Sequence, residues 1–197
     1  MKRKWVLLSI VLMVILLYAP GCNRLENLTN SGSKLICAGI TGTDLDGNPD
    51  STTIFSDVLR NGSVVNDNAK ATLTAVLLDP DNTASTFYQD IIVDQVDITY
   101  TRSDGLNQPG KDVPYGFSQR VYMRVGIGDT IDLPFVLVQH TAKLESPLVE
   151  LINLGQEKIL KVEAQVTIYG KDVAGNRVEP AVGIVSVWFS NFTDPEQ

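Results

Sequence analysis

The sequence predicts an all-β body, an antiparallel β-sandwich of about eight strands with one short helix, over residues 34–197. Apolar and polar residues alternate with period two through most of this range, which is typical of strands with one buried face. Turn dipeptides such as Asp46-Gly47 and Asn61-Gly62 separate the alternating segments. Only one stretch has the spacing of a helix.

The clearest strand is expected at 159–169, where Val162, Ala164 and Val166 face inward. The segment 131–137 contains Pro134, which indicates an edge strand or a bulge because proline donates no ladder hydrogen bond. The segment 182–189 is apolar on both faces, which predicts a central position in a sheet. The remaining expected strands are 34–40, 53–59, 71–78, 96–101 and 120–125.

A single helix is expected over 142–154, crossing one end of the sheets. Pro147 would lie near its first turn, where proline is tolerated. The apolar positions with helical spacing are Leu144, Leu148, Leu151 and Ile152.

The N-terminus has the pattern of a targeting segment. Lys2, Arg3 and Lys4 precede an apolar run at 5–18, which is shorter than the ~20 residues that a spanning helix needs. A basic cluster, a short apolar run and then small residues are typical of a secretory signal.

Ala19, Gly21 and Cys22 follow this run and resemble the lipobox of bacterial lipoprotein precursors. The resemblance implies a signal peptide at 1–21, a diacylglyceryl group on the Cys22 thiol, and often acylation of the new amino group. Residues 22–33 then form the lipidated cysteine and a flexible polar tether, and 34–197 form the domain. An ordinary signal peptide or an uncleaved anchor, with Cys22 incidental, is the alternative.

The net charge of the chain limits the partners that are expected for it. Cleavage before Cys22 removes three of the 16 Lys and Arg residues and none of the 23 Asp and Glu residues, leaving 13 against 23 and a formal charge of −10. Such a body would be repelled by anionic lipid, so acyl chains are its expected link to the membrane. The acidity also argues against nucleic acid as a partner. Asn23 after the cysteine favours the outer over the inner membrane of the cell envelope, by resemblance to enterobacterial lipoproteins.

The segment 169–176 contains Asp172-Val173-Ala174-Gly175-Asn176, which resembles the D-x-A-G-N turn of bacterial immunoglobulin-like domains. In that family this turn joins the last two strands. The resemblance implies that the sandwich is immunoglobulin-like. The whole body is also similar to small uncharacterised envelope lipoproteins, a likeness that implies no activity.

One segment has the spacing of a metal loop. Asp44, Asp46 and Asp50 place oxygen ligands around a glycine turn, and they resemble part of the calcium loops of adhesion repeats. A solvated turn between two strands is the alternative interpretation. Calcium is therefore a candidate cofactor, and the only one.

Other candidate chemistry is sparse. His140 lacks a nucleophile motif or a second histidine, so a hydrogen-bonding role at a strand end is expected. Cys37 is expected to pack as a small apolar residue. The acidic positions Asp90, Asp94 and Asp97 suggest the solvent side of a strand. The aromatic residues are interpreted as strand formers: Tyr88, Tyr100, Tyr115, Phe117 and Tyr122.

These observations predict a lipid-anchored, non-enzymatic envelope protein with a binding or structural role, presenting loops or a sheet edge to an envelope partner. A calcium-assisted carbohydrate-binding or adhesive module is the alternative, with a glycan as partner. A hydrolase using His140 or a pair of carboxylates is the third hypothesis.

Overall fold

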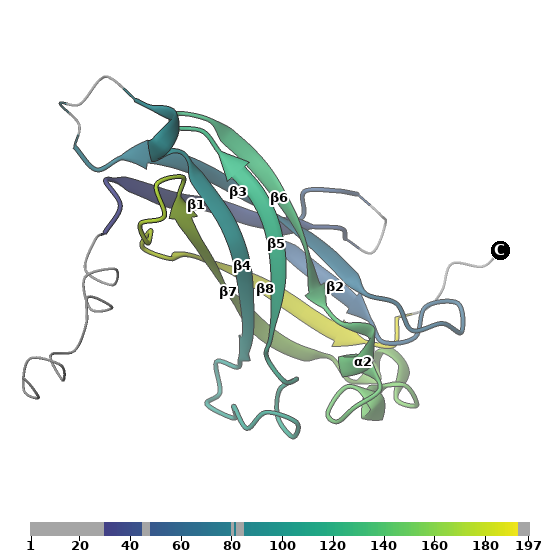
Figure 1. The fold of residues 1–197 in the computed structure, drawn as a ribbon. Helices are drawn as coiled ribbons and strands as arrows, with labels where there is room; N and C mark the ends of the chain where they lie inside the picture. The colour runs from purple at the N-terminus through teal and green to yellow at the C-terminus, as the bar shows by residue number, and fades with distance from the viewer. Residues whose placement is uncertain (1–29, 45–47, 80, 82–84, 193–197) are drawn as a thin grey trace, which may run out of the picture. The chain divides into compact units, whose positions relative to one another are not determined.

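A computed structural model describes residues 30–44, 48–79, 81 and 85–192. The chain divides into two units, Met1–Asn30 and Ser31–Gln197, and the second unit carries the fold. It is an all-β sandwich of two sheets, as the alternating pattern predicts (Figure 1). No helix within the described residues is long and apolar enough to cross a membrane.

The first sheet has three antiparallel strands and the second has five. In sheet order, the first contains β1 (Ser33–Gly42), β3 (Asp67–Leu77) and β6 (Thr130–Val138). The second contains β2 (Thr53–Asp57), β8 (Ala181–Ser190), β7 (Leu160–Asp172), β4 (Ile91–Thr101) and β5 (Phe117–Val125). Pro134 lies on the edge strand β6, so that prediction is confirmed.

The strand order is that of an immunoglobulin-like sandwich. In that arrangement strands A, B and E share one sheet, and strands C, F and G form the centre of the other. Here β1, β3 and β6 take the first set of places and β4, β7 and β8 the second. One pair departs from the antiparallel prediction, because β2 runs parallel to β8. The chain changes sheets between β1 and β2. As a result, β2 lies beside the last strand, β8, and runs in the same direction as β8.

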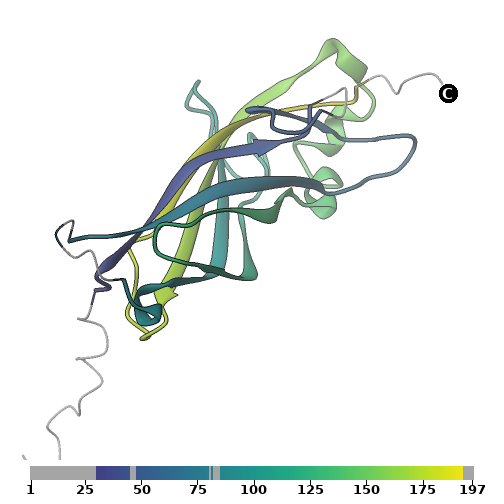
Figure 2. The ribbon, with the colours of Figure 1, turned by 90° about the horizontal axis from the view of Figure 1, so that it is seen from above.

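Alternating side chains of the two sheets meet in one apolar core. On β7, Val162, Ala164, Val166 and Ile168 are buried while their neighbours are exposed or half-buried. β1 runs beside β8 (Figure 2). Gly183 permits this approach, since a Cβ there would lie 2.6 Å from the Cδ1 atom of Ile40.

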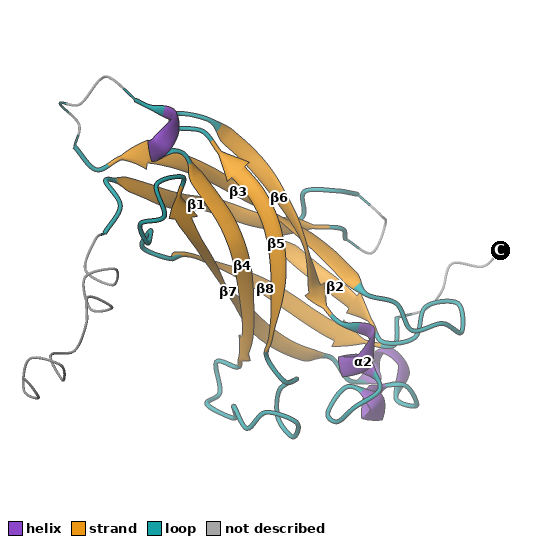
Figure 3. Ribbon diagram, viewed as in Figure 1, coloured by secondary structure: helices purple, strands orange, loops and turns teal. Residues whose placement is uncertain are grey.

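The predicted helix over 142–154 is wrong. The segment instead contains a four-residue helix, α2 (His140–Lys143), followed by the 3₁₀ turns η2 (Val149–Leu151) and η3 (Gly155–Glu157). Pro147 explains the break, because proline disfavours helical geometry in the residue before it and removes a backbone donor. Helical turns lie only at the ends of the described sheets (Figure 3).

β8 lies between β2 and β7, as its apolar sequence predicts, but its outer face is not covered throughout. Val182 and Ile184 are 49% and 62% exposed. β2 pairs only with residues 186–190 of β8. Among the described residues, the first half of β8 therefore has no paired strand on the side of β2, and its outer face exposes aliphatic side chains.

Gln119 joins the edge strands of the two sheets. Its side-chain amide donates to the Val136 carbonyl at 2.7 Å, and its side-chain oxygen accepts from the Val136 N–H at 3.1 Å. One side chain of β5 thus satisfies two backbone groups on the open edge of β6. Together with Pro134, it protects that edge from pairing with another chain.

Replacing Gln119 by alanine should lower the free energy of unfolding by about 1–2 kcal/mol, because two half-buried backbone groups lose their partner. Urea denaturation of the two proteins measures the difference. Gln165→Ala is the matched control: Gln165 is exposed on β7, and its loss should change stability by less than about 0.5 kcal/mol. Equal effects of the two substitutions would contradict the proposed bridge.

Candidate functional site

The loop between β1 and β2 contains the predicted calcium ligands. The Asp44 carboxylate accepts hydrogen bonds from the Asn48 N–H at 2.7 Å and the Asn48 side-chain amide at 3.0 Å. Asp172 and Asn176 close the β7–β8 turn in the same way, at 2.8 and 2.9 Å. Both segments read D-x-x-G-N, so Asp44 has the role of a turn-closing residue. Asp46 lies outside the described residues.

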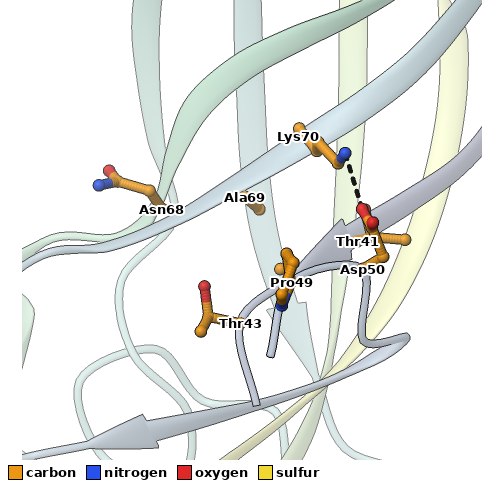
Figure 4. Close-up of a pocket in the computed structure, with 8 residues that line it drawn as sticks. Thr41, Thr43, Pro49, Asp50, Asn68, Ala69 and Lys70 are labelled. Atoms are coloured by element: carbon orange, nitrogen blue, oxygen red, sulfur yellow. Dashed lines mark hydrogen bonds and ion pairs between the residues drawn. The ribbon is translucent and has the colours of Figure 1, made fainter. Parts of the chain in front are cut away.

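Asp50 turns toward a lysine. Its carboxylate lies 2.7 Å from the Lys70 ammonium (Figure 4). The same ammonium lies 3.1 Å from Asp132. Thr72 donates to Asp132 at 2.8 Å. Hydrogen bonds from Thr72 and Lys70 lower the pKa of Asp132, and those to Asp50 and Asp132 raise the pKa of Lys70. The outer face of the three-stranded sheet thus carries a small charged network.

Beside this network lies a shallow pocket of about 200 Å³. Pockets for organic ligands typically have about 300–1,000 Å³ and an aromatic lining. Here the lining has no aromatic side chain, and Lys70 already supplies the positive charge beside Asp50. The lining residues are Thr41, Gly42, Thr43, Pro49, Asp50, Asn68, Ala69 and Lys70.

The predicted ligands are not brought together by what the structure describes. Asp44 is bound to Asn48 and Asp50 to Lys70, and nowhere in the described residues do three His, Cys, Asp or Glu side chains form a group that could hold a metal ion. Calcium binding by this loop stays a prediction. The geometry favours a turn stabilised by its own side chains.

His140 begins α2 on an exposed surface. Its N–H donates to the side-chain oxygen of Asn66 at 2.6 Å, and its Nδ1 atom lies 3.1 Å from the same oxygen. This contact fits a hydrogen-bonding residue at a strand end. Among the described residues, no carboxylate is hydrogen-bonded to the imidazole, so the arrangement of a Ser-His-Asp site is not formed around it.

Cys37 is half-buried on β1 and packs against the core. Burial raises the pKa of its thiol, which leaves less of the reactive thiolate. The expected role as a small apolar residue fits this environment.

The three acidic positions near β4 have separate partners. Asp90 forms an ion pair with Arg124 and accepts the Ile127 N–H at 3.2 Å. Asp94 lies 3.8 Å from Lys171, whereas Asp97 accepts a hydrogen bond from Gln95. The interpretation as solvent-facing residues is wrong for Asp90, which is buried, because Arg124 and a backbone N–H compensate its charge. Each of the three carboxylates is therefore engaged by a neighbour of its own.

The five aromatic residues singled out in the sequence do not form one platform. Tyr100 is buried, and its hydroxyl donates to the Leu137 carbonyl at 2.6 Å. Burial raises the pKa of Tyr100. Tyr115 precedes β5, whereas Tyr88 lies in η1 (Phe87–Gln89), which leads into β4. Because an eleven-residue strand separates η1 from the far end of β4, these two rings lie about 30 Å apart.

A buried ion pair between α2 and β3 was not predicted from the sequence. Lys143 is fully buried, and its ammonium lies 2.9 Å from the Asp67 carboxylate and 2.8 Å from the Asp57 carbonyl. The Ser56 hydroxyl donates to Asp67 at 2.5 Å. Burial raises the pKa of Asp67, and the charge of Lys143 opposes that rise. Helical spacing placed Leu144 inward, but Leu144 is exposed and its neighbour is buried instead.

Comparison with known proteins identifies no family for this chain. No protein-family model and no curated protein matches this chain. Its function is therefore argued from its own residues.

Replacing Lys143 by methionine should lower the free energy of unfolding by about 3–5 kcal/mol, because the buried Asp67 loses its cation while the volume is kept. Chemical denaturation measures the change. Lys158→Met, at an exposed lysine after η3, is the control and should be nearly neutral. Adding Asp67→Asn to Lys143→Met should recover part of the loss; no recovery would mean that packing, not charge, is responsible.

Proposed function

We propose that this chain is a lipid-anchored protein of the bacterial cell envelope, more specifically of the outer membrane, with a non-catalytic binding or structural role. The anchor is Cys22, which follows a basic cluster, a short apolar run and a glycine. Two or three acyl chains at one cysteine give durable attachment, whereas one chain alone binds only marginally.

The observation that carries the proposal is the fixed point at which the chain joins the body after Cys22. The Ser31 N–H donates to the Arg177 carbonyl at 2.9 Å, and the Gly32 carbonyl accepts from the Leu78 N–H at 2.9 Å. The Ser33 hydroxyl donates to the Gln89 carbonyl at 2.7 Å. We call residues 31–33 the tether root. Eight residues, 23–30, separate it from Cys22, so an extended chain holds the body within about 30 Å of its anchor.

A non-catalytic role is supported by how the polar side chains are used. Asp67 and Lys143 neutralise each other, Asp90 is bound by Arg124, and His140 contacts Asn66. Each of these contacts stabilises a turn, a strand end or the crossover between sheets. A catalytic group instead needs to reach a substrate in a cleft.

A partner strand is proposed to bind at the first half of β8. On the side of β2, residues 181–185 have no paired strand among those described, and Val182 and Ile184 are exposed. Exposed aliphatic residues on an open edge favour the addition of an extended segment from another protein. Two of the other edges are protected, that of β6 by Gln119 and Pro134 and that of β5 by Arg120 and Arg124.

The anchor is tested by metabolic labelling with palmitate and by the mass of the N-terminal peptide. Wild-type protein should incorporate the label and begin at an acylated Cys22, and Cys22→Ser should reduce labelling to background. Cys37→Ser, the only other cysteine in the chain, is the control and should keep full labelling. An intact Met1, or an unmodified thiol at residue 22, would refute the proposal.

The binding edge is tested by placing a photoreactive phenylalanine analogue at Val182 in living cells. A discrete adduct is expected, and adding Ile184→Asp should reduce its yield about tenfold, because a charge then faces the incoming apolar strand. The analogue at Thr99, exposed on β4 in the same sheet, is the control and should give no such adduct. An adduct of equal yield with and without Ile184→Asp would exclude this edge.

A further inference from the structure

We infer that the end of the sandwich carrying the tether root also contacts the bilayer directly, with Leu78, Phe87 and Tyr88 in the interfacial region of the lipid. The inference rests on the proposed anchor at Cys22. It adds a second contact with the membrane and therefore a fixed orientation of the body.

The three apolar residues are exposed next to the tether root. Leu78, Phe87 and Tyr88 are 57%, 55% and 66% exposed. The Leu78 N–H itself donates to Gly32 of the root, and Gln89, next to Tyr88, accepts from Ser33. In Figure 1, η1 lies at the end of the sandwich where β1 begins. Any anchor that precedes residue 31 therefore brings this end of the body toward the membrane.

Neighbouring side chains hold the aromatic pair in place. The Arg124 guanidinium carbon lies 4.3 Å from the centre of the Phe87 ring, and Arg124 is itself paired with the buried Asp90. The rings of Phe87 and Tyr88 meet edge to face at 6.0 Å. Because Phe87 and Tyr88 are already held in this arrangement, little conformational entropy is lost when their rings enter the interface.

The chemistry of Leu78, Phe87 and Tyr88 fits the lipid interface. Aromatic rings with a polar tip, such as tyrosine, prefer the boundary between headgroups and acyl chains. Asp79 and Asp81 follow Leu78 in the sequence, so attraction to anionic lipid does not explain the contact. The expected contact is apolar, and zwitterionic phosphatidylcholine is the appropriate probe.

The opposite end provides an internal reference. Leu106 is 52% exposed in the loop between β4 and β5. β4 has eleven residues, so this loop lies about 30 Å from η1 along the strand. An anchored body that contacts lipid through Tyr88 keeps Leu106 in water.

The test uses full-length protein extracted from the envelope and reconstituted in phosphatidylcholine vesicles, with tryptophan placed at Tyr88 or at Leu106. Lipid brominated near the headgroup end of its acyl chains quenches tryptophan at the interface. After subtraction of the signal from the native Trp188, Tyr88→Trp should be quenched about twofold or more relative to Leu106→Trp, with a blue-shifted emission. Thermal unfolding of both variants, expected at the wild-type midpoint, verifies that they are folded.

The outcomes separate the inference from the anchor on which it rests. Vesicle-bound protein with equal quenching at the two positions, or none at either, overturns the membrane contact and leaves the anchor intact. Protein that does not remain with the vesicles refutes the anchor, and the inference falls with it. Stronger quenching at Leu106 would show the reverse orientation and also overturn the inference.

Discussion

The buried pair of Lys143 and Asp67 is the constraint on which the arrangement of the two sheets depends. It joins three parts of the chain: α2 contributes the lysine, β3 the carboxylate, and β2 the Asp57 carbonyl and the Ser56 hydroxyl. β2 belongs to the five-stranded sheet and β3 to the other. Two buried charges are costly without each other, so a packing that separates them is strongly disfavoured. The pair thereby specifies where the crossover segment and β2 lie.

The same principle recurs at the other end of the sandwich. Asp90 is buried beside Arg124, and Asp172 is buried within the turn that Asn176 closes. Between these polar ends, the core is formed by aliphatic side chains of alternating strands. At these positions, charged groups therefore serve to end strands and fix turns. The function of the chain is expected in its edges, its ends and its attachment.

Much of this fold follows from local sequence. Alternation identified strands such as β7, and Pro134 identified an edge, because both depend on one residue's own geometry or face. The break at Pro147 is also local, but the expected helix placed this proline in its first turn, where proline is tolerated. The burial of Lys143 depends on tertiary partners that lie far away in the sequence. Helical spacing favoured Leu144 as core, but the ion pair with Asp67 determined which side chain turned inward. In the same way, the apolar pattern on both faces of β8 predicted its place in the sheet. It did not predict that Val182 and Ile184 stay exposed. That exposure depends on the length of β2, which pairs only with residues 186–190 of β8.

The position of the open edge on β8 limits what its partner can be. Ala181 follows Arg177, which binds the tether root, by about four residues, or about 13 Å of extended chain. Residues 181–185 therefore lie at the end of the body nearest the proposed anchor. An extended segment that adds to this edge must approach within a few nanometres of the bilayer surface. Together, the proposed anchor and the proposed binding edge require a partner segment that reaches the membrane-facing end of the sandwich.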